Sequence, residues 1–359
     1  MDEKQRKSAG NPIIKSNYTA DPSAHVWPTD PDRLYLYPST DIAPPAGCDL
    51  MDQYHVYSTD NMLDWIDHGE ILRRDDLPEE AWGPHYSNAF FMWAPDAAYH
   101  PNHPEGKGPY FYIFPHSVGN MDAGEDRWNS NWKLGVAYSD SPYKGFKENE
   151  IAILKDKDGN IITGDGWLID PCFFKEGDDF YLVTGGSQEC RIAKLSPDLT
   201  SLIEDFHVYT QAELPHYHEG PWMFTRVNDE GEKLYYLMYP GAIGGDGDDM
   251  LYAISKTGVY GPWDYQGSFL KPVGTGDTSH GSIVNFKGKW YVFYHNAELS
   301  NGKGNLRSVC CDELFFNSDG TIQMVEQTTT SVAAIGKEVD TEELDAKFGK
   351  GNYSIEEKS

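Results

Sequence analysis

Tyr181-Leu182-Val183 carries a pattern that the chain repeats: a tyrosine, an aliphatic residue and then another apolar residue. The pattern occurs at Tyr35-Leu36-Tyr37, Tyr112-Ile113-Phe114, Tyr181-Leu182-Val183, Tyr236-Leu237-Met238 and Tyr291-Val292-Phe293. Aromatic and β-branched residues in short apolar runs favour buried strands. A second strand-like run follows each of the five. About four strands repeated five times predict an all-β fold, a five-bladed β-propeller with four-stranded blades and an axial funnel.

Composition supports this prediction and sets the domain boundaries. Aromatic residues make up 14% of the 359 residues, and 35 glycines and 22 prolines supply turns along the whole chain. Length alone predicts about two domains, but the repeat indicates a single propeller domain over residues 11–330. We expect 331–359 to be a polar C-terminal tail that holds at most one short helix, near 341–348.

The charge balance excludes two classes of partner. The chain has 57 acidic and 29 basic residues, a formal net charge of −28. Such a protein repels nucleic acid and anionic membranes, and no apolar run approaches the roughly 20 residues of a membrane helix. We expect no nucleic-acid partner and no membrane insertion. Because the N-terminus has no apolar signal core, the compartment stays open: secreted or periplasmic if a leader was removed, otherwise cytoplasmic.

One polar residue stands beside a proline or glycine shortly before each tyrosine motif. These residues are Asp21, Asp96, Asp170, Glu219 and His280. If each opens the innermost strand of its blade, all five face one axial funnel. A turn is the simpler explanation for any single carboxylate, because Asp-Pro commonly initiates turns. Recurrence at five equivalent positions, together with the cost of gathering like charges, instead indicates an active site in that funnel.

The surrounding motifs resemble the pattern of glycoside hydrolase family 43. They are Ala-Asp-Pro-Ser at 20–23, Trp-Ala-Pro-Asp at 93–96, Ile-Asp-Pro at 169–171, Glu-Gly-Pro-Trp at 219–222 and His-Gly-Ser-Ile-Val at 280–284. The resemblance spans about Asn11 to Gln327 and implies a five-bladed propeller and an inverting hydrolase. It implies β-xylosides and α-L-arabinofuranosides of plant cell walls as substrates, so we expect an oligosaccharide or polysaccharide partner.

The resemblance assigns roles to three carboxylates. Asp21 matches the general base, Glu219 the general acid, and Asp170 the carboxylate that keeps Glu219 protonated and oriented. An inverting glycosidase needs its base and acid about 6.5–9.5 Å apart, a separation that opposite blades of a funnel provide. A nearby like charge raises the pKa of a carboxyl group, as an acid that works near neutral pH requires.

Four further residues are predicted to contact substrate. Asp96, the second choice for the modulating carboxylate, is expected to support the pocket. Trp93 precedes Asp96 by three residues and Trp222 follows Glu219 by three, so both can flank the sugar ring, although packing between blades is more common for a tryptophan. Arg307 matches a pocket arginine of the family that binds a sugar hydroxyl or holds a carboxylate. The alternative for Arg307 is a strand-face arginine paired with a surface acid.

His280 matches the histidine that the family carries at the propeller axis. There the resemblance implies a structural calcium ion whose other ligands are mostly water. Calcium prefers oxygen, so the alternative is a histidine that hydrogen-bonds an axial carboxylate. The run His216, Tyr217 and His218 precedes the acid, where it can shape the leaving-group site.

The resemblance favours an exo-acting enzyme that releases terminal α-L-arabinofuranosyl units. The alternative is an exo-β-1,4-xylosidase or a bifunctional enzyme, disfavoured because the chain lacks the added β-sandwich of many family β-xylosidases. An endo-arabinanase or a non-catalytic carbohydrate-binding propeller fits less well, since a binding module would usually have lost one of the three acids. A propeller that only binds protein partners would be expected to have blades of regular length and no clustered acids. Neither expectation fits this sequence.

Overall fold

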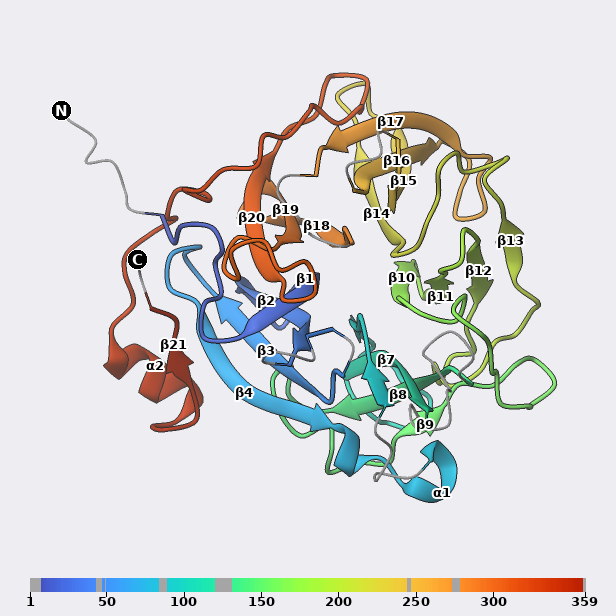
Figure 1. Cartoon of the computed structure of the whole chain (residues 1–359), viewed down its shortest axis with the longest axis horizontal. Coiled ribbons are helices and arrows are strands. Elements are labelled where there is room, and N and C mark those ends of the chain that lie inside the picture. Colours follow the sequence, from blue (N-terminus) through green and yellow to red (C-terminus); the bar gives the residue numbers. More distant parts are fainter. Residues whose placement is uncertain are drawn as a thin grey trace.

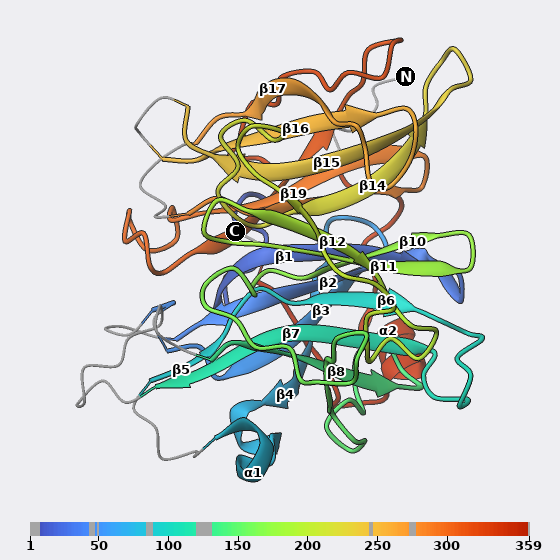
Figure 2. The same ribbon diagram turned by 90° about the vertical axis from the view of Figure 1, so that its right-hand side faces the viewer.

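The computed structural model describes residues 8–42, 47–48, 50–83, 89–119, 131–243, 247–272 and 278–357. Five antiparallel sheets follow one another along the chain and stand around a common axis (Figure 1). Figure 2 shows the same ring from the side, with long strands crossing the thickness of the disc. The predicted five-bladed β-propeller is therefore confirmed.

Each blade is built from strands that are consecutive in sequence, apart from one late addition to the first. Blade 1 contains β1 (Tyr18–Trp27), β2 (Asp30–Asp41), β3 (Gln53–Thr59), β4 (Ile66–Arg73) and β21 (Ser354–Ile355). Blade 2 contains β5 (Ala89–Met92), β6 (Asp96–Tyr99), β7 (Tyr110–Gly119), β8 (Lys133–Ser139) and β9 (Ala152–Ile153). Blade 3 contains β10 (Cys172–Glu176), β11 (Asp179–Thr184), β12 (Cys190–Lys194) and β13 (His207–Tyr209). Blade 4 contains β14 (Trp222–Val227), β15 (Lys233–Gly241), β16 (Asp249–Ser255) and β17 (Asp264–Leu270). Blade 5 contains β18 (Gly281–Phe286), β19 (Lys289–Asn296) and β20 (Ser308–Leu314).

The five tyrosine motifs all lie on the strand that follows the innermost one, namely on β2, β7, β11, β15 and β19. These strands have hydrogen-bonded neighbours on both sides. Strands in that position are covered on both faces by adjacent blades, which is why their apolar residues run consecutively instead of alternating with polar ones.

The innermost strands carry the polar residues of the repeat. Strands β1, β6, β10, β14 and β18 contact one another in succession and close the ring. Asp96 begins β6, His280 stands directly before β18, and Asp170 and Glu219 stand shortly before β10 and β14. Asp21 lies within β1, at a register break of the β1–β2 pair. The repeat thus brings equivalent positions of all five blades to the axis.

The prediction of four strands per blade does not hold for every blade. Within the described residues blade 5 has three strands, because the chain after β20 folds back through a Phe316–Ile322 bridge and then joins blade 4. The side chain of Asn11 accepts the N–H of Cys311 at 3.0 Å and donates to its carbonyl at 3.1 Å. Asn11 therefore satisfies part of the open edge of β20, where an unpaired strand would invite association.

The C-terminal segment packs on blade 1, outside β4 (Figure 1). Helix α2 (Thr341–Phe348) is capped by the Asp340 side chain, which accepts the N–H of Glu343 at 2.8 Å. The helix buries Leu344 and Phe348 against blade 1. Two short helical turns, η1 (Arg74–Asp76) and α1 (Glu79–Trp82), follow β4. No helix in the described part of the chain is both long and apolar enough to cross a membrane.

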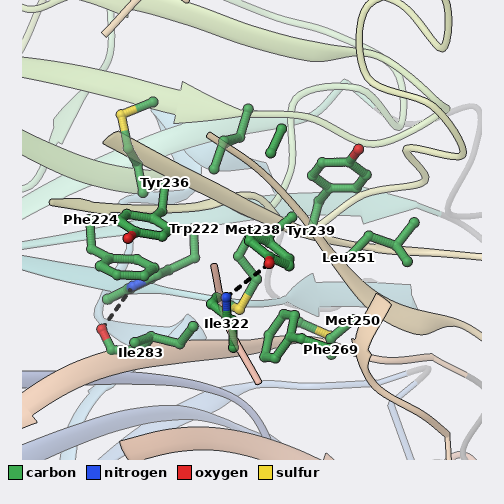
Figure 3. Packing of buried hydrophobic residues seen from close by; sticks show 14 of the residues in the cluster. Trp222, Phe224, Tyr236, Met238, Tyr239, Met250, Leu251, Phe269, Ile283 and Ile322 are labelled. Atoms are coloured by element: carbon green, nitrogen blue, oxygen red, sulfur yellow. Dashed lines mark hydrogen bonds between the residues drawn. The ribbon is translucent and has the colours of Figure 1, made fainter. Parts of the chain in front are cut away.

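The hydrophobic core lies mainly between neighbouring blades. Figure 3 shows part of the cluster around blade 4, where Phe224 and Tyr236 stack with ring centroids 4.5 Å apart. Trp222 belongs to the same cluster, and its indole Nε1 donates to the carbonyl of Ile283 in blade 5 at 3.2 Å. Aromatic residues bury large areas and suit such interfaces, which accounts for the aromatic content of the chain.

Candidate active site

Asp21 is held by donors from blades 1 and 5. Its φ of 48° turns the chain out of the regular ladder at the register break. Its Oδ1 accepts Arg307 Nη1 at 3.0 Å and lies 3.5 Å from His280 Nδ1, and its Oδ2 accepts the Ser39 hydroxyl. The backbone N–H of Asp21 donates to His295 Nδ1 at 3.0 Å. The carboxylate is therefore fixed in position and is only 6% exposed.

The surroundings of Asp21 favour its ionised form. Burial alone would raise the pKa of this carboxyl, but the charge of Arg307 and the neighbouring His280 outweigh burial and hold the pKa well below its usual range. Because Asp21 stays ionised at all ordinary pH values, its carboxylate can accept a proton from water.

His295 acts as a neutral hydrogen-bonding partner. Burial and the charge of Arg307 lower the pKa of His295 to about 3. Because Nε2 lies 2.9 Å from the carbonyl of Thr278, we assign the proton to Nε2 and leave Nδ1 free to accept the N–H of Asp21. This histidine thus fixes the backbone of Asp21 without adding charge.

Arg307 joins two acids of blade 1. Its Nη2 and Nε donate to Asp41 at 2.7 and 3.0 Å, its backbone N–H donates to the same carboxylate at 2.8 Å, and Nη1 reaches Asp21. The Arg307 side chain is 5% exposed and both acids that it contacts are buried, so the alternative of a surface ion pair is wrong. The arginine instead holds a carboxylate in the site, which is one of the two contacts expected of it.

Asp170 and Glu219 form a second acidic pair, contributed by blades 3 and 4. Asp170 has a φ of 52° and accepts the N–H of Gly220 at 3.1 Å, which joins the two acidic segments directly. Burial raises the pKa of Asp170, and the charges of Glu219 and Asp21 raise it further, only partly offset by His280. Burial also raises the pKa of Glu219 despite His218 and His280. Both carboxyl groups therefore hold a proton to higher pH than an isolated carboxyl group would.

His280 lies among these three carboxylates. Burial lowers its pKa, but the hydrogen bond to Asp21 and the charges of Asp170 and Glu219 prevail, so the pKa is raised overall. The structure therefore brings together Asp21, Asp170, Glu219 and His280, from four different blades. The sequence predicts two roles for His280, a calcium ligand and a partner of an axial carboxylate. The contact with Asp21 agrees with the second role.

Asp96 has a different set of partners from these four residues. It is 1% exposed and accepts hydrogen bonds from Ser23, from His25 Nε2 at 2.7 Å and from the N–H of Phe173. These donors come from β1 and β10, so Asp96 joins the innermost strands of blades 1, 2 and 3. Its oxygens are occupied by protein donors, which leaves it a role in positioning strands.

The two predicted tryptophans differ in their surroundings. Trp222 is 6% exposed and packs between blades 4 and 5 (Figure 3). Trp93 is half-buried, its Nε1 donates to the carbonyl of Cys48 at 3.2 Å, and its ring lies 4.6 Å from that of Trp132. Trp222 therefore packs in the core, whereas Trp93 is only partly buried.

Four residues that contact Asp21 or Arg307 were not predicted from the sequence: Ser39, His295, Asp41 and Thr278. Ser39 and His295 each stand four residues after a motif tyrosine, and antiparallel pairing returns that end of β2 and β19 to the start of β1 and β18. That shared position is the signal that could have found them. Asp41 and Thr278, which also contact Arg307, carry no comparable signal.

The model of the glycosyl hydrolases family 43 matches residues 9–322. The chain belongs to this family. It is 32% identical over 356 residues to xylosidase/arabinosidase 43A of Humicola insolens, covering 87% of this chain and 98% of the relative. It is 28% identical to a β-xylosidase of Xylanibacter ruminicola, covering 88% of this chain and 98% of that protein. This family 43 chain is thus a glycosidase.

Solved structures agree with this assignment. A family 43 β-xylosidase/α-arabinofuranosidase from a compost microbial metagenome, in complex with xylotriose in a calcium-free form, matches with a TM-score of 0.67 and 32% identity. The match covers 89% of this chain and 98% of the other. A GH43_1 enzyme from Xanthomonas citri complexed with xylotriose matches with a TM-score of 0.66 and 27% identity, covering 89% and 94% of the two chains.

The donor set around His280 limits how calcium can bind. Calcium usually takes six to eight oxygen ligands. Among the described residues no group of three or more His, Cys, Asp or Glu side chains could hold a metal ion. The residues present thus fit only an ion that takes most of its ligands from water, with His280 as its protein ligand. Such an ion would add positive charge beside Asp21, Asp170 and Glu219.

Proposed function

We propose that this family 43 glycosidase is an inverting, exo-acting enzyme that releases terminal β-D-xylosyl and α-L-arabinofuranosyl units from oligosaccharides. Support for the dual substrate comes from the xylosidase/arabinosidase relatives of Humicola insolens and Bacteroides ovatus, which are 32% and 31% identical to this chain. The motifs favour an arabinofuranosidase, but these relatives favour the alternative, a bifunctional enzyme.

One arrangement carries the mechanism: Asp21, which Arg307 contacts at 3.0 Å and whose pKa is held low, lies near the Asp170–Glu219 pair, whose pKa values burial raises, with His280 among the three. Asp21 would accept a proton from water while the water oxygen attacks the anomeric carbon. Glu219 would give its proton to the glycosidic oxygen as the bond from that oxygen to the anomeric carbon breaks. Asp170, which accepts the N–H of Gly220 next to Glu219, would orient the Glu219 segment, and its own carboxyl would share the retained proton with Glu219. The products are a free sugar of inverted anomeric configuration and the remaining oligosaccharide, released with a hydroxyl group at the cleaved bond.

The test follows product anomers by NMR with nitrophenyl β-D-xyloside, nitrophenyl α-L-arabinofuranoside and xylobiose. We expect hydrolysis of all three, with α-xylose as the first product of the β-xylosides, because water attacks the face opposite the leaving group. Formation of β-xylose first would contradict the inverting scheme. Binding of xylobiose without hydrolysis would instead identify a carbohydrate-binding propeller.

Calcium at His280 is a separate part of the proposal. Calorimetric titration of the metal-stripped protein should show calcium binding that is lost in His280→Ala. Stripping should lower hydrolysis of the xyloside, and added calcium should restore it, because the ion changes the charge beside three carboxylates. Unchanged activity after chelation would leave calcium without a role.

A further inference from the structure

His218, the residue before Glu219, is anchored on one side of its ring. Its Nδ1 lies 2.6 Å from Asp248 Oδ2, and the carbonyl of Asp248 accepts the Ser279 hydroxyl at 2.6 Å, next to His280. The Asp248 side chain is 9% exposed, whereas that of His218 is 45% exposed. No described residue hydrogen-bonds Nε2, the other ring nitrogen. The ring is therefore oriented from within and open toward solvent.

The backbone of His218 is fixed as well. Its N–H donates to the carbonyl of Pro240 in blade 4 at 3.1 Å, and its carbonyl accepts the N–H of Gln188 in blade 3 at 3.0 Å. Two blades thus hold the main chain that carries both His218 and Glu219. The imidazole therefore keeps a constant position relative to the proposed acid.

The imidazole also keeps its proton. The hydrogen bond to Asp248, partly opposed by burial and aided by the charge of Glu219, raises the pKa of His218 to about 9. At neutral pH both ring nitrogens then carry hydrogen. Nδ1 donates to Asp248, and Nε2 is left as an oriented, charge-assisted donor, a strong type of hydrogen-bond donor.

We propose that His218 determines specificity by donating Nε2–H to a hydroxyl of the leaving-group sugar. The inference rests on the proposed function, in which the reacting sugar lies between Asp21 and Glu219. The glycosidic oxygen that Glu219 protonates then joins that sugar to a leaving group on the exposed side, where His218 stands. The site would thus select oligosaccharides over glycosides whose leaving group offers no hydroxyl.

Two variants separate this donor from the anchor to Asp248. In His218→Asn the amide nitrogen can replace Nδ1 and keep the bond to Asp248, but nothing replaces Nε2. In His218→Gln the longer amide can reach the position of Nε2. The matched control is His207→Asn, an exposed histidine on β13 whose ring stacks on Tyr260 at 4.2 Å.

The readout is kcat/KM on xylobiose and on nitrophenyl β-D-xyloside. We expect His218→Asn to lose about tenfold on xylobiose, as for one charge-assisted hydrogen bond, and less than about twofold on the nitrophenyl substrate. His218→Gln should recover part of the loss on xylobiose alone, and His207→Asn should match the wild type. Thermal melting of each variant checks that it is folded.

Three other outcomes would overturn the inference. Equal losses on both substrates would mean that His218 acts only by positioning Glu219. An unchanged kcat/KM on xylobiose would mean that no sugar contacts Nε2. A wild-type protein that hydrolyses neither substrate would refute the proposed function, and this inference with it, whereas the first two outcomes leave the proposed function intact.

Discussion

Asp21 and Asp170 occupy matching positions in two parts of the ring. Each precedes a proline, each has a left-handed backbone with φ near 50° (48° and 52°), and each is 6% exposed. Their pKa values nevertheless move in opposite directions, downward for Asp21 and upward for Asp170. Residue type, backbone and burial are the same, so the neighbours must set the difference.

Those neighbours are of opposite charge in the two regions. Asp21 receives the guanidinium of Arg307 at 3.0 Å, and this cation outweighs burial. Asp170 faces Glu219, and the partial compensation from His280 leaves burial dominant. A fold that repeats one acidic position can thus lower the pKa of one carboxyl group and raise that of another, because the arginine contacts only one of them.

The largest expected effect comes from removing the proposed base and the proposed acid in turn. Asp21→Asn should lower kcat about 10³-fold or more on both xylobiose and nitrophenyl xyloside, because both reactions need activated water. Glu219→Gln should lower kcat similarly on xylobiose but far less on nitrophenyl xyloside, whose leaving group departs without protonation. Steady-state kinetics on the two substrates measure both effects.

Calorimetric binding of xylobiose to each variant is the control, and binding should persist in both. If the substrate dependence were reversed, with Asp21→Asn spared on the nitrophenyl substrate, the two regions would have exchanged roles. Equal losses for Glu219→Gln on both substrates would remove the assignment of Glu219 as acid.

The next largest effect concerns Arg307, the cation that contacts Asp21. Arg307→Met leaves Asp21 and Asp41 buried without their partner and should lower the free energy of unfolding by about 3–5 kcal/mol. The matched control is Arg73→Met, because Arg73 pairs with Glu70 at 2.8 Å with a side chain that is 41% exposed. Exposed pairs contribute about 0–1 kcal/mol. Urea denaturation compares the variants, and equal losses would show that the buried network is no stronger than the surface pair.

The fold was predictable because its signals are local. A tyrosine motif and an acid beside a proline can be read within a few residues, and their order along the chain gives the blades. The gathering of Asp21, Asp170 and Glu219 followed from recurrence alone. Their catalytic roles remain predictions.

The remainder of the site depends on contacts between distant segments. Asp96 shares the sequence signal of the other acids, yet hydrogen bonds from β1 and β10 enclose it. Trp222 follows Glu219 by three residues but lies in the core between blades. Such differences arise from how blades pack, and a motif read along one strand does not contain that information.

The smallest expected effect removes the like charge from the acidic pair. In Asp170→Asn, Glu219 loses a neighbouring carboxylate, so its pKa should fall and the alkaline limb of the pH–rate profile should move down by about one pH unit. The stability of Asp170→Asn relative to the wild type should rise with pH. Because the folded-state pKa of Asp170 is raised to about 8 from 3.8, the wild type loses stability as pH rises between these values, and asparagine does not.

Thermal melting at pH 5 and pH 8 tests this linkage. The advantage of Asp170→Asn over the wild type should be larger at pH 8, since more of Asp170 is then ionised in the folded wild-type protein. Asp21→Asn should show no such gain, because Asp21 is already ionised and paired with Arg307 at both pH values. If both variants gained stability equally with pH, burial rather than the neighbouring charge would govern the two regions alike, and the contrast between them would fail.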